Sequence, residues 1–385
     1  MKKFCLVITA LLVISSMVLS ACAPAATPVA PAAPTTAPVI EATTAPVAPT
    51  TAPVVETTTA PVAPTTATMV EATTAPVAVK TVRVCVSWNE QIHSLIKAWE
   101  DYMQTYGTTS GLKNGVMFEW IINVANSDAV QQANNIQDCI NQKVDVIVAR
   151  AEDSGTIGAS IATAKAANIP FITLDRVAAA SSPQPTAHVG EDSYKQALST
   201  ATAFAKLLKE KGVQGKCIEF EGDLLDMNAV FRHQAWAEVE KSEAAWTTVA
   251  TVPTQWKPEL FYSGGLNALQ AHPEANCIYT ASDFTFSSIE NALQAVDKLA
   301  PTGDPKHVWV AADDLHPQGY AAMVKKYIDV GTTFEVYDQA VLLVDVLTKI
   351  ALGQPVDASN LVSGRLATPD MVETMSHLYA RDYTD

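Results

Sequence analysis

The strongest constraint on the fold is a regular alternation of strand-length and helix-length patterns that begins at Lys80. Short runs of β-branched and apolar residues, such as 81–87, are typical of buried strands. Longer stretches between them, such as 91–106, place apolar residues three and four positions apart, as helices do. Strands are predicted at 81–87, 116–124, 144–149, 170–174, 216–220, 247–252, 277–280 and 307–311, and helices at 91–106, 130–142, 157–167, 193–211, 232–242, 260–271 and 288–299.

This order predicts an α/β fold. Strands that alternate with helices favour parallel sheets covered by helices. The alternation runs twice, with a division near Gly190, so we expect two doubly wound parallel-sheet domains. In such sheets, ligands bind at the carboxyl ends of the strands.

The region before Lys80 has a different composition. Residues 1–79 hold 11 of the 22 prolines and none of the 16 glycines, and their Thr/Pro/Ala repeats cannot build a core, so we expect a disordered linker at 23–79. The first 22 residues begin with two lysines and an apolar run, as a signal peptide does. Leu19-Ser20-Ala21-Cys22 resembles the lipobox of bacterial lipoproteins, which implies lipidation of Cys22 and a membrane anchor; an ordinary signal peptide is the alternative.

Charge excludes some partners. The chain carries a net charge of −15, and only five charged residues precede Lys80, so the acidity lies on the folded body. An acidic body argues against nucleic-acid binding and against docking on anionic lipid headgroups through charge.

Polar and aromatic residues gather where the predicted strands end. Carboxylates accept hydrogen bonds from hydroxyls, guanidinium groups donate in a planar fork, and indole covers apolar C–H faces, so this set suits a sugar. No nucleophile–base pair, phosphate-binding loop or zinc-helix motif is present in the sequence, and the histidines form no ligand-spaced pair, so we expect no enzyme, no catalytic residue, no cofactor and no metal. The strand-end residues are Ser87, Trp88, Arg150, Asp175, Arg176, Glu191, Asn228, Arg232, Trp256, Ser282, Asp283, Asp313 and Asp314.

The body resembles the ribose- and xylose-type periplasmic sugar-binding proteins, the type I solute-binding components of bacterial ABC importers. The resemblance covers about residues 81–368 and is strongest from Asp145 to Arg176, where an Asp-Arg pair ends a strand. It also covers 188–192, where the family crosses into its second domain, and Asp226-Met227-Asn228-Ala229 with Arg232 after it. The family implies two α/β lobes joined by a multi-strand hinge, here 80–191 plus about 339–368 and 192–338 plus about 369–385.

The resemblance also implies a set of ligand-binding residues. Departures from the ribose pattern fall at Arg150, Glu191 and Ser282, which implies a sugar other than ribose and leaves a charged ligand open. The implied set is Ser87, Trp88, Gln91, Arg150, Asp175, Arg176, Glu191, Asn228, Arg232, Trp256, Ser282, Asp313 and Asp338.

The function implied by this resemblance is capture of a monosaccharide or similar hydroxylated molecule between two lobes. The protein would be extracytoplasmic and lipid-anchored, and would deliver its ligand to an ABC transporter permease and its ATPase. Two alternatives remain open: a ligand-sensing receptor component for a membrane kinase or chemoreceptor, and a glycoside-acting enzyme. For Cys85, Cys139, Cys217 and Cys277, buried free thiols are expected, although Cys217 and Cys277 both begin strands and would be neighbours if those strands pair.

Overall fold

The computed structural model describes residues 79–91 and 93–383. The predicted signal peptide, the predicted lipidation site Cys22 and nearly all of the predicted linker lie outside the described residues. Within the described part of the chain, no helix is both long and apolar enough to cross a membrane.

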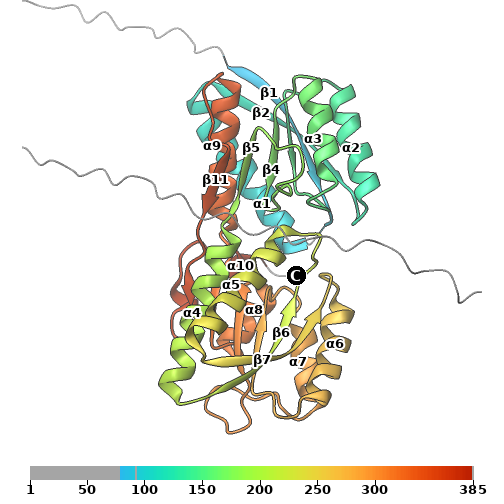
Figure 1. Cartoon of the computed structure of the whole chain (residues 1–385). Helices are drawn as coiled ribbons and strands as arrows, with labels where there is room; N and C mark the ends of the chain where they lie inside the picture. The colour runs from blue at the N-terminus through green and yellow to red at the C-terminus, as the bar shows by residue number, and fades with distance from the viewer. Residues whose placement is uncertain (1–78, 92, 384–385) are drawn as a thin grey trace, which may run out of the picture. The chain divides into compact units, whose positions relative to one another are not determined.

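The first lobe contains a six-stranded parallel sheet in the order β11-β5-β4-β3-β1-β2. Side chains alternate between its faces, so Val84 and Val86 of β1 face one apolar cluster, which includes residues of α1 and α9, while Cys85 faces another, which includes residues of α2 and α3. Figure 1 shows the helices on both sides of this sheet. Its elements are β1 (Lys80–Trp88), α1 (His93–Tyr106), a π-helical turn (Gly107–Gly111), β2 (Val116–Val124), α2 (Ala129–Asn141), β3 (Val146–Ala149), α3 (Ile157–Ala166), β4 (Phe171–Leu174), β5 (Ala187–Glu191), α9 (Val336–Ala351) and β11 (Ser359–Val362).

The second lobe repeats this plan in the order β12-β10-β9-β8-β6-β7, with β12 antiparallel to β10 and the other pairs parallel. One apolar cluster includes residues of α6, α7 and α8, and the cluster on the other face includes residues of α4 and α5. Its elements are α4 (Ser193–Lys211), β6 (Gly215–Glu221), α5 (Met227–Glu243), β7 (Trp246–Pro253), α6 (Pro258–Ala271), β8 (Cys277–Thr280), α7 (Phe286–Ala295), β9 (Trp309–Asp314), α8 (Pro317–Val324), β10 (Val330–Thr333), β12 (Leu366–Ala367), a 3₁₀ turn (Val372–Thr374) and α10 (Tyr379–Asp382). The expected α/β class with two doubly wound sheets is confirmed.

The chain passes between the two sheets three times: after β5, between β10 and α9, and between β11 and β12. Helix α9 begins at Val336 and packs into the first lobe, and β12 belongs to the second sheet. We propose lobe boundaries at 80–191 plus 335–364 and 192–334 plus 365–383.

Two predicted element boundaries differ in ways that affect the site. Helix α5 was predicted from Arg232 but begins at Met227, because the Asp226 carboxylate accepts a hydrogen bond from the Asn228 backbone N–H and caps the helix. Strand β9 was predicted to end at Ala311 but continues to Asp314, because its last residues pair with β10. Asp313 and Asp314 are therefore part of the strand and point to opposite faces.

The expectation of free thiols was wrong. The structure joins Cys85 to Cys139 and Cys217 to Cys277 in disulfides. The second bond links residues that lie directly opposite each other on the paired strands β6 and β8. This disulfide pairing could not be deduced from the sequence, because it depends on which strands become neighbours in the fold.

Candidate functional site

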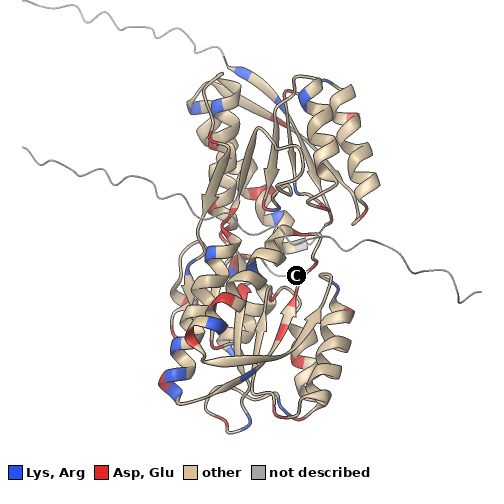
Figure 2. Ribbon diagram, viewed as in Figure 1, with Lys and Arg blue, Asp and Glu red and all other residues tan. Residues whose placement is uncertain are grey.

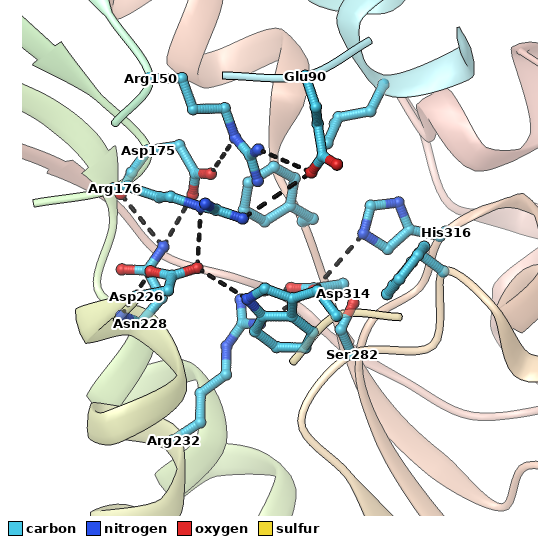
Figure 3. A pocket seen from close by; sticks show the side chains of 14 residues that line it. Glu90, Arg150, Asp175, Arg176, Asp226, Asn228, Arg232, Ser282, Asp314 and His316 are labelled. Carbon is cyan, nitrogen blue, oxygen red and sulfur yellow. Dashed lines mark hydrogen bonds and ion pairs between the residues drawn. The ribbon is translucent and has the colours of Figure 1, made fainter. Parts of the chain in front are cut away.

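The candidate site is a cavity at the carboxyl ends of strands from both sheets. Figure 2 shows acidic and basic residues where the two lobes meet, and Figure 3 shows charged side chains from both lobes pointing toward one another across the cavity. The lining residues are Glu90, Leu95, Arg150, Asp175, Arg176, Asp226, Asn228, Arg232, Trp256, Ser282, Phe284, Asp314, His316 and Phe334.

The structure brings together seven of the thirteen residues predicted for the ligand site. They come from strand ends and loops of both lobes, as the fold class requires. These seven are Arg150, Asp175, Arg176, Asn228, Arg232, Trp256 and Ser282.

The remaining six do not line this cavity. Gln91 and Asp338 are exposed, and Ser87 is fully buried beneath the strand ends. The Trp88 ring is also buried, stacks on Trp99 and donates from Nε1 to Glu100 at 2.8 Å. The other two are also buried: Glu191 lies at the hinge and Asp313 lies in the second lobe.

Asp313 faces the core of the second lobe. Its carboxylate accepts hydrogen bonds from the Tyr279 hydroxyl at 2.7 Å and from the Thr332 hydroxyl at 3.0 Å. Burial raises the pKa of Asp313 to about 6, although Arg232 opposes this shift. The neighbouring Asp314 lies on the other face of β9 and lines the cavity in its place.

Glu191 lies at the hinge. Its Oε2 accepts a hydrogen bond at 3.3 Å from the backbone N–H of Glu335, where β10 leads into α9. Burial raises the pKa of Glu191 well above the ordinary value for a glutamate. Burial therefore favours the neutral form of this carboxyl group. Its contact with Glu335 makes Glu191 a hinge residue.

Sequence reasoning missed Glu90, Asp226 and His316, together with several apolar lining residues. Asp226 was visible in the sequence as the first residue of the motif that contains Asn228, and an acidic residue before a helix is a helix-cap signal. Glu90 and His316 follow β1 and β9 by two residues, so a wider search beyond each strand end would have included them.

Arg150 and Asp175 form the first charged pair of the cavity. The Arg150 Nε donates to the Asp175 carboxylate at 2.7 Å, and its Nη1 donates to the Asn89 side-chain oxygen at 2.6 Å. Asn228 of the second lobe donates to the other Asp175 oxygen at 3.0 Å. Burial alone would lower the pKa of Arg150, but Asp175 and Glu90 outweigh it and raise that pKa, so Arg150 keeps its charge.

Arg176 and Asp226 form a second pair that joins the lobes. The Arg176 Nε lies 2.9 Å from an Asp226 oxygen, and the same oxygen accepts a hydrogen bond from Trp256 Nε1 at 3.1 Å. The Trp256 ring packs over Gly222, where a Cβ would overlap the indole. Asp226 thus fixes the aromatic face and one guanidinium at the same time.

Arg232 and Asp314 form the third pair. The Arg232 Nη2 donates to Asp314 Oδ1 at 2.6 Å and its Nη1 donates to Oδ2 at 3.0 Å, a bidentate geometry. Arg232 also donates to Gln196 Oε1 and to the Ala281 carbonyl, so its guanidinium nitrogens are all hydrogen-bonded to protein oxygens. Burial would raise the pKa of Asp314, but Arg232 outweighs it and lowers that pKa; Arg232 therefore positions a charged Asp314 toward the cavity.

Three lining residues have left-handed backbone conformations: Asp175, Trp256 and Asp314, with φ of 62°, 56° and 88°. Non-glycine residues adopt this region at a cost and persist there when surrounding contacts hold them. Such residues are concentrated at ligand sites, and here each one directs a side chain into the same cavity.

The fold and the cavity define a protein of two α/β lobes that holds a small polar molecule between its strand ends. The family model described as periplasmic binding protein domain matches residues 84–355. The chain belongs to this family, whose members bind solutes and are not enzymes.

The chain is also similar to two ribose import binding proteins. The ribose import binding protein RbsB of Escherichia coli (strain K12) is 26% identical over 203 residues, which cover 53% of this chain and 64% of the relative. The ribose import binding protein RbsB of Bacillus subtilis (strain 168) is 25% identical over 187 residues, 48% of this chain and 56% of the relative. The chain therefore spans less than two thirds of the length of these two relatives.

Solved structures share the fold. A solute-binding protein of an ABC transporter from Bacillus halodurans C-125, with bound myo-inositol, matches with a TM-score of 0.67 and 23% identity, covering 78% of this chain and 98% of that one. A periplasmic solute-binding protein from Actinobacillus succinogenes 130z, with bound D-allose, matches with a TM-score of 0.67 and 17% identity over 76% of this chain and 100% of that one.

Proposed function

We propose that this protein is an extracytoplasmic solute-binding protein that captures a monosaccharide or polyol and delivers it to an ABC transporter permease. The observation that carries the proposal is the cavity itself, in which three arginine–carboxylate pairs and aromatic rings face each other from two lobes. Hydroxyl groups both donate and accept, so they match such paired charges. The relatives named as ribose import proteins, and the similar folds with bound myo-inositol and D-allose, support the same ligand class.

The charge of the cavity favours a neutral ligand over a sugar acid. Its lining holds three arginines against four carboxylates, Glu90, Asp175, Asp226 and Asp314. Because Arg232 directs its donors at protein acceptors, it offers no free fork to a ligand carboxylate. An anionic ligand would meet an excess of negative charge and would lose hydration without a paired cation.

Contacts that the ligand makes only in the closed state would supply the free energy that favours closure of the lobes. Polar contacts already link the lobes: the Arg176–Asp226 ion pair, the bond from Asn228 to Asp175, and the bond from the Ser154 N–H to the Leu225 carbonyl at 3.0 Å. All three lie around or beside the cavity, so a ligand that bridges the same groups would favour the closed arrangement.

A thermal-shift screen tests this function, because a ligand that binds the native state raises the apparent stability by about 2.7 kcal/mol at a concentration of 100 Kd. Pentoses, hexoses and cyclic polyols are expected to raise the Tm, and the corresponding sugar acids are not. A response to sugar acids alone would contradict the neutral-ligand proposal, and a response to no member of the panel would contradict the sugar-binding proposal.

Asp175→Asn is expected to weaken binding of the ligand found in that screen by about 30-fold or more, which equals about 2 kcal/mol. Asparagine tolerates the left-handed backbone at this position but removes the charge that faces Arg150. Isothermal titration calorimetry measures the change. The matched control is the Asp338→Asn variant, which changes an exposed residue outside the cavity. Its ligand affinity should equal that of the parent protein.

We further propose that Cys22 carries a lipid that anchors the protein to its membrane, on the support of the Leu19-Ser20-Ala21-Cys22 motif after an apolar run. In cells that express the full chain, Cys22→Ala should move the protein from the membrane fraction to the soluble fraction. Cys5→Ala, within the apolar run, is the control and should leave the protein with the membrane. Equal membrane association of the two variants would contradict the anchor.

A further inference from the structure

A second cluster of ligand-type side chains lies in the second lobe, outside the cavity. Glu219 and Glu221 are two residues apart on β6, so their side chains share one face of the strand. His233 lies on α5, and its imidazole Nδ1 is 2.9 Å from a Glu219 oxygen and 3.2 Å from a Glu221 oxygen. One strand and one helix thus bring three potential metal ligands together.

The spacing of these atoms suits one small cation. The ligand atoms of the three residues lie within 4.8 Å of one another. A tetrahedral zinc ion with bonds of roughly 2.0–2.2 Å sets its ligand atoms roughly 3.3–3.5 Å apart. The two nitrogen–oxygen distances are already close to that value, so only small side-chain rotations are needed.

Charge at the cluster also favours a cation. Among the described residues, His233 is the one side chain in hydrogen-bond or ion-pair contact with either carboxylate. The Glu219 side chain is only 2% exposed, and Glu221 and Glu240 add negative charge close to it. Glu240 is not a ready ligand, because its oxygens accept hydrogen bonds from the Thr248 backbone N–H and hydroxyl. Three carboxylates therefore lie near one imidazole, and a bound cation would offset this excess of negative charge.

The cluster of Glu219, Glu221 and His233 is open to solvent on one side. The His233 side chain is 43% exposed and the Glu221 side chain 13% exposed, whereas Glu219 closes the inner side. An ion held there could enter from solvent and keep a water molecule as its fourth ligand.

We propose that Glu219, Glu221 and His233 form a zinc-type metal site with three protein ligands. An imidazole with two carboxylates suits Zn²⁺ or a similar transition ion, whereas Mg²⁺ and Ca²⁺ prefer oxygen ligands alone. The sequence predicted no metal site, because its histidines form no ligand-spaced pair; the three ligands proposed here come from β6 and α5, which the fold brings together.

The site also adjoins elements that build the ligand cavity. His233 follows Arg232 on α5, and Glu221 precedes Gly222, on which the Trp256 ring packs. A metal bound to both elements would tie α5 to β6 in the native state alone, so it should stabilise the second lobe by mass action.

Calorimetric titration of the metal-free, full-length protein with ZnCl₂ tests the proposal. One ion per chain is expected to bind, with MgCl₂ giving no heat of binding at the same concentrations. His233→Ala should weaken the affinity by about 100-fold or more, since three ligands become two. The matched control is His272→Ala, which removes a half-buried histidine that pairs with one glutamate, Glu274, and should leave the affinity unchanged.

Two further measurements separate the site from other zinc binding. Because protons compete with a metal ion for imidazole and carboxylate ligands, the zinc affinity should fall between pH 7.5 and pH 5.5. Zn²⁺ should raise the Tm of the parent protein and of His272→Ala but not that of His233→Ala. Absence of zinc binding by the parent protein, or equal affinity of His233→Ala and the parent, would overturn the proposal; neither result bears on sugar binding.

Discussion

Arg232→Met is expected to abolish detectable ligand binding and to lower the free energy of unfolding by about 3–5 kcal/mol. Arg232 is 3% exposed, and its guanidinium holds both oxygens of Asp314, which lines the cavity and is itself 4% exposed. Removal of the arginine leaves a buried carboxylate without its counter-charge, and that desolvated charge is the source of the cost. Chemical denaturation measures stability and calorimetry measures binding.

A double variant separates the two effects. Arg232→Met with Asp314→Leu replaces the buried pair by apolar side chains, so much of the lost stability should return while binding stays absent. Lys206→Met, which breaks an exposed pair with Glu210, is the control and should change stability by less than about 1 kcal/mol. Wild-type ligand affinity in the double variant would show that this pair does not belong to the ligand site.

The β-α alternation was sufficient to predict the fold, because parallel sheets with helices on both faces have few arrangements. Strand 116–124 and helix 193–211 were predicted with the limits that the structure shows. The last third of the chain was harder to read. Strands β10, β11 and β12 have four residues or fewer, which gives a weak sequence pattern, and β11 and β12 pair with the non-consecutive strands β5 and β10.

The site was predicted in part for the same reason. Arg150, Asp175 and Arg176 directly follow buried strands, so a strand-end rule finds them. The choice between Asp313 and Asp314 depends on where β9 ends and on which face each residue occupies, and a shift of one residue exchanges the two. Cavity residues such as Glu90 and Asp226 were missed because their position depends on loop geometry beyond the strand.

The disulfides were missed for a related reason. Cys277 begins β8 and Cys217 lies near the start of β6, but only the pairing of these two strands places the cysteines opposite each other. Disulfides form and persist in oxidising compartments. Two of them in the body therefore agree with the extracytoplasmic location that we propose.

Cys217→Ala with Cys277→Ala is expected to lower the free energy of unfolding by about 4 kcal/mol. The bond closes a segment with a sequence separation of 60 residues, and its loss restores conformational freedom to the unfolded chain. The comparison with the parent protein, by urea denaturation without reductant, gives the value. Both sulfurs are buried beside Phe204 and Trp246, so alanine keeps an apolar site there and adds only a small packing loss.

Reductant provides the independent control for this effect. Reduction of the parent protein should lower stability by more than it does in the double variant, because the parent has two bonds to lose and the variant retains only Cys85–Cys139. Equal stability of the parent and the double variant under oxidising conditions would mean that these cysteines are thiols in the folded protein. Ligand affinity should stay unchanged in the double variant, since the bond lies at the start of β6 and β8 while the cavity lies at the opposite ends of the strands.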